Sequence, residues 1–159
     1  MSTNQTSFSS EETSLIEKVE RAVRSSIKTD FEILKNGRVE RSFTSHLARA
    51  IQDEISEHNI YGDPFYNKHL GAAKYLNGKI IELDVAVHER NVDTNNLVAI
   101  ELETNNHPEG NDIWKIEGLT HNLGGYGYKI GLYLVVGVSE RAGEIITMDW
   151  YKSGSKVKI

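Results

Sequence analysis

Three carboxylates lie on two consecutive segments in which apolar and polar residues alternate. Residues 79–88 read Lys-Ile-Ile-Glu-Leu-Asp-Val-Ala-Val-His and contain Asp84, and residues 97–104 read Leu-Val-Ala-Ile-Glu-Leu-Glu-Thr and contain Glu101 and Glu103. A period of two in segments rich in Val, Ile and Leu predicts strands. The polar residues between the segments predict a turn, so that the two strands pair antiparallel. We therefore expect the three carboxylates to lie near one another on one face.

Carboxylates held this close repel each other, which raises the pKa of at least one unless a cation lies between them. Oxygen ligands on adjacent strands suit Mg²⁺, which needs only one or two protein carboxylates besides water and phosphate oxygens, and they also suit Mn²⁺. The same alternation is typical of the solvated outer face of an antiparallel sheet. The pattern alone leaves the metal site and the plain acidic face both open.

Composition restricts the class of protein. A chain of 159 residues can form one domain with a substantial core, and 38% hydrophobic with 26% charged residues is typical of a soluble globular protein. No apolar run is long enough to span a membrane, and no signal peptide opens the chain. The sequence has no cysteine, which excludes disulfides, thiolate nucleophiles and cysteine-bound zinc. We expect a cytoplasmic protein without membrane contacts.

The charge is unevenly distributed along the chain. The formal net charge of −5 argues against nonspecific coating of DNA. Residues 61–125 hold 10 Asp and Glu against 5 Lys and Arg, whereas residues 126–159 hold 3 against 5. The acidic excess therefore surrounds the three carboxylates, as expected both for a cation-loading site and for an ordinary acidic surface.

Helical spacing and capping residues predict the elements that position these groups. Ser9 and Glu12 form a capping box for a helix over residues 11–28. A second helix begins near Arg41 or Ser42, with Glu40 at its start where the helix dipole favours a negative charge. Three further elements are predicted: a short strand over Phe31–Leu34, a turn at Gly62-Asp-Pro64, and a short strand or loop from His69 to Leu76.

Beyond the paired strands, Asn111 or Asp112 caps a predicted helix that carries Lys115, runs to about Asn122 and ends at Gly124-Gly125. The continuous apolar run Ile130–Val138 predicts a strand buried on both faces. The remaining predictions are one more strand over Glu144–Trp150, an exposed basic tail with Lys152, Lys156 and Lys158, and a flexible tail over residues 1–10.

This order of elements predicts an α/β fold: a mixed β-sheet flanked by helices in a single domain over residues 11–159. Aromatic and basic residues between 61 and 75 fit either a nucleic-acid-binding loop or ordinary core packing with a solvated loop. They are Tyr61, Phe65, Tyr66, Lys68, Lys74 and Tyr75.

The chain resembles the PD-(D/E)XK nuclease superfamily, whose restriction-endonuclease-like core runs helix, three-stranded meander, helix, strand. Ile81-Glu-Leu-Asp84 matches the acidic residue of the family's second strand, and Glu101-Leu-Glu103 lies where the family has Glu-x-Lys. Glu40 matches an acidic residue that many members carry on the first core helix. The resemblance covers about residues 40–138 and implies a Mg²⁺- or Mn²⁺-dependent deoxyribonuclease.

The resemblance assigns roles residue by residue. It implies that Asp84 and Glu101 bind the metal, that Glu103 binds it or acts as the base, that Lys115 assists, and that Glu40 belongs to the catalytic set. Glu103 departs from the family pattern, in which a lysine stands there. Some members use Glu-x-Glu and others move the lysine onto the following helix, where this chain has Lys115.

Two functions from different classes remain at this stage. The first is a metal-dependent nuclease that cleaves DNA, which a homodimer would serve if both strands are cut by one complex. The second is a catalytically weak or inactive module on the same fold that binds a protein or nucleic acid in a regulatory or defence role. We favour the first because of the resemblance, whereas the departure at Glu103, the negative net charge and the small size of the chain are the arguments for the second.

Overall fold

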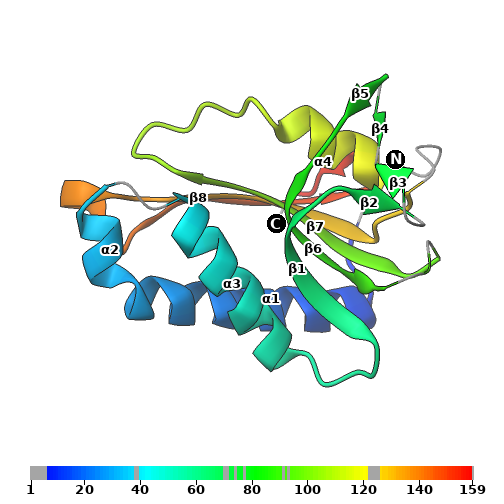
Figure 1. Ribbon diagram of the computed structural model, residues 1–159, viewed down its shortest axis with the longest axis horizontal. Helices are drawn as coiled ribbons and strands as arrows, with labels where there is room; N and C mark the ends of the chain where they lie inside the picture. Colours follow the sequence, from blue (N-terminus) through cyan, green and yellow to red (C-terminus); the bar gives the residue numbers. More distant parts are fainter. Residues whose placement is uncertain are drawn as a thin grey trace, which may run out of the picture.

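A six-stranded mixed β-sheet separates two helical layers (Figure 1). The computed structural model describes residues 7–37, 40–69, 72–73, 75–76, 78–90, 92, 94–121 and 126–158. The helices are α1 (Ser10–Thr29), α2 (Phe31–Lys35), α3 (Glu40–Glu54), α4 (Ile113–Thr120) and the 3₁₀ turn η1 (Ser139–Arg141). The strands of the large sheet are β1 (Ile60–Tyr66), β6 (Leu83–Glu89), β7 (Asn96–Thr104), β8 (Ile130–Val136), β9 (Ile145–Lys152) and β10 (Ser155–Lys156).

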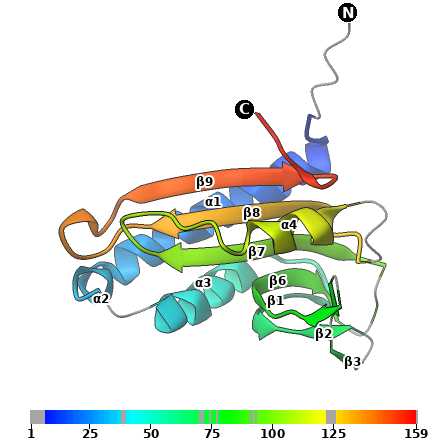
Figure 2. The same ribbon diagram turned by 90° about the horizontal axis from the view of Figure 1, so that it is seen from above.

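The sheet order is β1-β6-β7-β8-β9-β10. β1, β6 and β7 form an antiparallel meander, and β8 returns parallel to β7 after α4 has crossed the sheet. Helices α1 and α3 cover one face and α4 covers the other, as the two orthogonal views show (Figures 1 and 2). Two small hairpins, β2–β3 (Lys68–His69 with Ala72–Ala73) and β4–β5 (Tyr75–Leu76 with Lys79–Ile80), lie between β1 and β6 in the chain.

Apolar side chains of the sheet pack on both layers. The larger core cluster joins the inner faces of α1 and α3 to Val85, Val98, Ile100 and Trp150. On the other face, Ala86 and Ala99 are in a cluster with Leu119 from α4. All seven residues of β8 are buried, which confirms the prediction of a strand covered on both faces.

The first two helices predicted from the sequence are confirmed as α1 and α3. Ser9 and Glu12 form the capping box at the start of α1, with each side chain bonded to the other's backbone N–H. Helix α3 begins at Glu40, one residue before the predicted start. Phe8 packs against the core, so the described chain is already ordered within the predicted tail.

The prediction of a strand at Phe31–Leu34 was wrong, because these residues form α2. Within this helix Leu34 is fully buried whereas Phe31 is exposed. Asp30 is at once the C-cap of α1 and the N-cap of α2, so no extended residue intervenes. Four residues are too few for periodicity to separate a helix from a strand.

The turn predicted at Gly62-Asp-Pro64 was also wrong, because these residues lie inside β1. Within the large sheet β1 pairs only with β6, and proline is tolerated in an edge strand because one side of the strand needs no ladder partner. Helix α3 supplies partners on that side: Gln52 accepts from Gly62 N at 2.9 Å and donates to Ile60 O at 3.1 Å.

Three boundaries also differ. Residues 79–88 do not form one strand, because Lys79–Ile80 pair with β4 and β6 begins only at Leu83. Leu83 belongs to the core cluster with Leu119 of α4, whereas Val85 belongs to the cluster on the opposite face of the sheet. Helix α4 ends at Thr120 rather than near Asn122, and Gly124-Gly125 lie outside the described residues, as does Lys74.

The basic tail is only partly exposed. Lys152 lies at the end of β9, where its Nζ is 2.7 Å from Glu12 Oε1 and donates to Ser7 O at 3.0 Å. Lys156 and Lys158 are exposed, as predicted. Among the helices described, none has the length and apolar character to cross a membrane.

Candidate functional site

Asp84 and Glu101 come together because β6 and β7 pair antiparallel. The register joins Val85 to Ile100, and Asp84 and Glu101 are the next residues along these two strands. Asp84 Oδ2 accepts from the backbone N–H of Leu102 at 2.7 Å, which fixes its carboxylate against β7. Glu101 projects toward α4 and is only 2% exposed. Two of the three predicted carboxylates therefore meet under α4.

Glu101 is held in an environment that opposes its charge. Burial raises the pKa of this carboxyl well above its usual range, and the neighbouring Asp84 carboxylate raises it further. Glu101 Oε1 is buried and accepts no hydrogen bond within the described structure. Buried carboxylate oxygens are normally satisfied, so this atom requires a proton or a cation.

Lys115 provides a cation from the first turns of α4. Its Nζ lies 3.8 Å from Glu101 Oε1 and 3.2 Å from Asp112 Oδ1, and donates to Glu82 O at 3.5 Å. Burial lowers the pKa of Lys115, but Glu101 and then Asp112 outweigh this effect, so that the pKa is raised and the ammonium stays charged.

Close packing sets the position of α4 above the strands. A Cβ atom at Gly131 of β8 would lie 2.3 Å from Ile116 Cγ2, so the absence of a side chain lets α4 approach the sheet. Because Ile116 is next to Lys115 in the sequence, the same contact determines how far the ammonium stands from β7.

Glu40 joins the site from the start of α3. Its Oε1 accepts from Thr104 N, at the end of β7, at 3.1 Å. Partial burial raises the pKa of Glu40, the Thr104 N–H opposes the rise, and the carboxylates of Asp84 and Glu103 add to it. Three neighbouring carboxyl groups, those of Asp84, Glu103 and Asp112, therefore raise the pKa of Glu40.

Glu103 has its own set of donors. The hydroxyl of Tyr133, on the neighbouring strand β8, donates to Glu103 Oε2. The backbone N–H groups of Glu109 and Gly110 donate to the two oxygens at 3.1 and 3.4 Å. These contacts tie Glu103 to the loop that precedes α4, so its side chain has a positioning role in this arrangement.

The donor set fits a divalent cation through two carboxylates. Asp84 and Glu101 offer hard oxygen atoms on adjacent strands, and Glu101 Oε1 has no hydrogen-bond partner among the residues that the structure describes. Mg²⁺ accepts such a site, because water and substrate oxygens complete its six positions. No group of three or more His, Asp or Glu side chains suited to a metal is present among the described residues. The role of Glu103 as a third ligand therefore stays a prediction.

Two residues of this site had no functional role in the sequence analysis. Asp112 was expected only to cap α4, but its carboxylate contacts Lys115 instead and makes no side-chain cap bond. Tyr133 lies in the apolar run of β8, and its parallel register with Glu101 brings it to this face. The one hydroxyl group in the otherwise apolar sequence of β8 was the feature that could have pointed to Tyr133.

Comparison of the chain with protein-family models, with curated proteins and with solved structures found no match.

Proposed function

We propose that this protein is a metal-dependent nuclease that hydrolyses phosphodiester bonds of DNA, with a restriction-endonuclease-like core of the PD-(D/E)XK type. The order of α3, the β1-β6-β7 meander, α4 and the parallel strand β8 supports this reading, because it agrees with the core order of that superfamily. Asp84 and Glu101 then occupy the second and third strands of the meander.

One observation carries the proposal: Glu101 is buried beside Asp84 with one unsatisfied oxygen, and Lys115 faces it from α4. A structural acidic residue would normally lie in water or form a complete set of hydrogen bonds. Perturbed carboxyl groups together with a partly buried cation are typical of catalytic sites. Lys115 also occupies the helix to which some PD-(D/E)XK nucleases move their lysine.

The residues have distinct roles in this proposal. Asp84 and Glu101 bind the divalent cation, which when bound would supply charge stabilisation at the phosphate and acidify a water molecule. Lys115 stabilises negative charge on the phosphoryl oxygens and holds its charge because of Glu101 and Asp112. Glu40 accepts a proton at its free oxygen, and Glu103 orients the loop before α4 through Tyr133 and two backbone N–H groups.

The test is cleavage of supercoiled plasmid DNA with Mg²⁺ or Mn²⁺ by the wild type, Asp84→Asn and Glu101→Gln. Both variants keep the shape of the side chain while removing its charge, and we expect both to lose metal-dependent cleavage. Glu117→Gln, on the exposed side of α4, is the matched control and should cleave as the wild type does. Equal cleavage by all four proteins, or none by the wild type, would overturn the proposal.

A second function is favoured by the contacts of Glu103. The position at which the superfamily has lysine here carries a carboxylate that is fully engaged by Tyr133 and the loop. A module that kept the fold but not the chemistry would bind a protein or nucleic-acid partner without cleaving it. Metal-independent binding with no cleavage by the wild type would favour this second function.

A further inference from the structure

A cleft of about 450 Å³ lies between α3 and the edge strand β1. Ser45, Arg49 and Gln52 line it from the helix, and Tyr61, Asp63 and Arg90 line it from the sheet. Gly62 forms part of its floor: a Cβ atom there would lie 2.9 Å from Ala48 O, so glycine permits α3 to pack against the strand.

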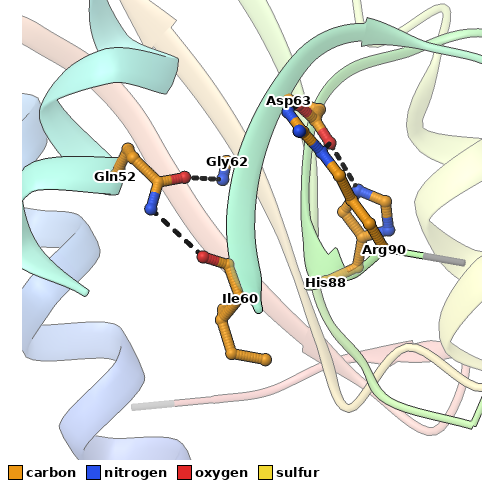
Figure 3. A network of polar contacts seen from close by, with 6 residues as sticks. All are labelled: Gln52, Ile60, Gly62, Asp63, His88 and Arg90. Carbon is orange, nitrogen blue, oxygen red and sulfur yellow. Dashed lines mark hydrogen bonds and ion pairs between the residues drawn. The ribbon is translucent and has the colours of Figure 1, made fainter. Parts of the chain in front are cut away.

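The one carboxylate among the described residues that line the cleft, that of Asp63, is already paired with neighbouring side chains. The carboxylate of Asp63 receives Arg90 Nε at 2.9 Å and His88 Nε2 at 2.8 Å, and Figure 3 shows both side chains directed at it. Burial raises the pKa of Asp63, but Arg90 and then His88 outweigh it and hold the pKa well below its usual range. The acidic residue of the cleft is thus already neutralised by its neighbours.

Two arginines keep their charge available. Arg41 and Arg49 are exposed on α3, and within the described part of the chain neither has an ion-pair partner. The guanidinium of Arg41 lies over the ring of Phe65, 4.0 Å from its centroid. Arg41 lies one helical turn before Ser45, the first residue of α3 that lines the cleft, and directly follows Glu40.

Phe65, which contacts Arg41, has an unusual backbone conformation. Its φ of 51° lies in the left-handed region, which is a rare conformation for a bulky side chain and usually has a functional or structural cause. Phe65 lies between Pro64 and Tyr66, which pair with Val85 and Leu83, and is therefore level with Asp84. At the other end of the strand, Arg90 covers the ring of Tyr61 at 3.8 Å.

We propose that the cleft between α3 and β1 binds the sugar–phosphate backbone of the nucleic acid that flanks the scissile phosphate, with Arg41 and Arg49 contacting phosphates. This inference rests on the proposed nuclease function and adds the path of the substrate. From Arg41 to Gln52 the helix extends about 16 Å at a rise of about 1.5 Å per residue. One DNA strand places a phosphate about every 3.4 Å along the axis, so the stretch of α3 from Arg41 to Gln52 spans about four or five nucleotides.

The local charge explains how a chain with a net charge of −5 binds DNA. Phosphate contacts position a nucleic acid without reading its sequence, and arginine is suited to them because its donors are fixed in one plane. The ring of Phe65 holds the guanidinium of Arg41, and the ring of Tyr61 holds that of Arg90, by cation–π contacts.

The experiment measures binding of a fluorescently labelled 20-base-pair DNA duplex by anisotropy in EDTA over a range of salt concentrations. It compares the wild type with Arg41→Ala, Arg49→Ala and the double variant. Arg24→Ala is the control, because Arg24 is an exposed arginine on α1 whose partner is Glu20 in the same helix. Phe65→Gly tests the ring separately, since glycine adopts the positive φ without strain.

We expect each arginine variant to weaken binding and to reduce the slope of log affinity against log salt by about 0.9. Phe65→Gly should weaken binding by about two- to fivefold, and Arg24→Ala should leave both quantities unchanged. Unchanged slopes in both arginine variants would overturn the proposal. Absence of DNA binding by the wild type at low salt would also overturn it.

Failure of this inference is distinguishable from failure of the nuclease function. Salt-dependent binding that requires Arg41 and Arg49, without cleavage in Mg²⁺ or Mn²⁺, supports the cleft and contradicts the nuclease. Metal-dependent cleavage with unaltered binding in the arginine variants supports the nuclease and contradicts the cleft.

Discussion

Lys115 Nζ lies 3.8 Å from Oε1 of Glu101, the least exposed carboxylate in the described part of the chain. The two residues come from different layers. Glu101 projects from β7 in the sheet, and Lys115 faces it from α4. The ammonium offsets only part of the cost of this buried charge, because burial and Asp84 together keep the pKa of Glu101 well above its usual range. An energetically unfavourable pair of carboxyl groups is therefore maintained at the centre of the candidate site.

Replacement of Glu101 by Gln should stabilise the metal-free protein at neutral pH. The pKa of Glu101 is raised in the folded state, so its contribution to stability is fully present below the unfolded pKa of about 4.3 and is lost as pH rises through the folded pKa. Glu101→Gln removes that loss. We expect a gain of about 1–3 kcal/mol at pH 7.5 and no gain near pH 4.5.

Urea unfolding in EDTA at these two pH values measures the difference. Glu117→Gln is the control, since that exposed side chain should change the free energy of unfolding little at either pH. A Glu101→Gln variant that is less stable than the wild type at neutral pH contradicts the assignment of an uncompensated buried charge.

Metal binding should release a proton. Since Glu101 keeps its proton to a higher pH than an ordinary carboxyl group, a divalent cation must displace that proton in order to bind. The apparent affinity for Mn²⁺ should therefore rise with pH. Calorimetric titration in two buffers of different ionisation enthalpy counts the protons released. A site whose affinity and enthalpy do not depend on pH or buffer would show that Glu101 is not a ligand.

Lys115→Met should reduce the rate of DNA cleavage by about 10²–10³-fold, the usual effect of losing one group that stabilises transition-state charge. Lys115→Arg keeps the charge and should recover part of the rate. Both variants should still fold, because the exposed fraction of this side chain is 18% and its partners are polar. Wild-type rates for Lys115→Met would remove Lys115 from the catalytic machinery and leave Asp84 and Glu101 unaffected.

Gly131→Ala should displace α4, and with it Lys115, from the sheet. The added methyl group would meet Ile116 Cγ2 at 2.3 Å and Thr120 Cγ2 at 3.0 Å, forcing α4 away from β8. We expect a loss of about 1–3 kcal/mol in the free energy of unfolding, typical of overpacking, together with reduced cleavage because Lys115 moves.

A double-mutant cycle separates this contact from a general loss of stability. Ile116→Ala alone creates a cavity, but combined with Gly131→Ala it removes the clash, so the two changes should be less than additive. Strictly additive changes in the free energy of unfolding would mean that the Gly131–Ile116 contact does not determine the distance between α4 and the sheet.

Periodicity predicted the parts of the fold in which one face is plainly apolar. The capping box and apolar stripe of α1 and the buried run of β8 were recognised from sequence, and the alternation around Asp84 and Glu101 predicted the antiparallel pair. From these elements followed the mixed sheet flanked by helices. Local pattern was sufficient because each element buries its apolar face against a neighbour in the usual way.

The remaining elements depend on contacts that a local pattern does not encode. β1 contains glycine and proline and extends only because β6 pairs with one side and Gln52 with the other. In the site, the partners of Glu103 come from β8 and from the loop before α4, so its positioning by Tyr133 could not be read from the spacing of residues 101–104. Tertiary contacts determined both outcomes.

The most direct test of a metal-dependent site formed by Asp84 and Glu101 is calorimetric titration of Mn²⁺ and Mg²⁺ into the wild type and Asp84→Ala, run beside a plasmid-nicking assay. We predict specific binding with proton release by the wild type, loss of that binding in Asp84→Ala, and nicking only where the metal binds. Absence of specific metal binding by the wild type, or nicking by Asp84→Ala at the wild-type rate, would contradict it.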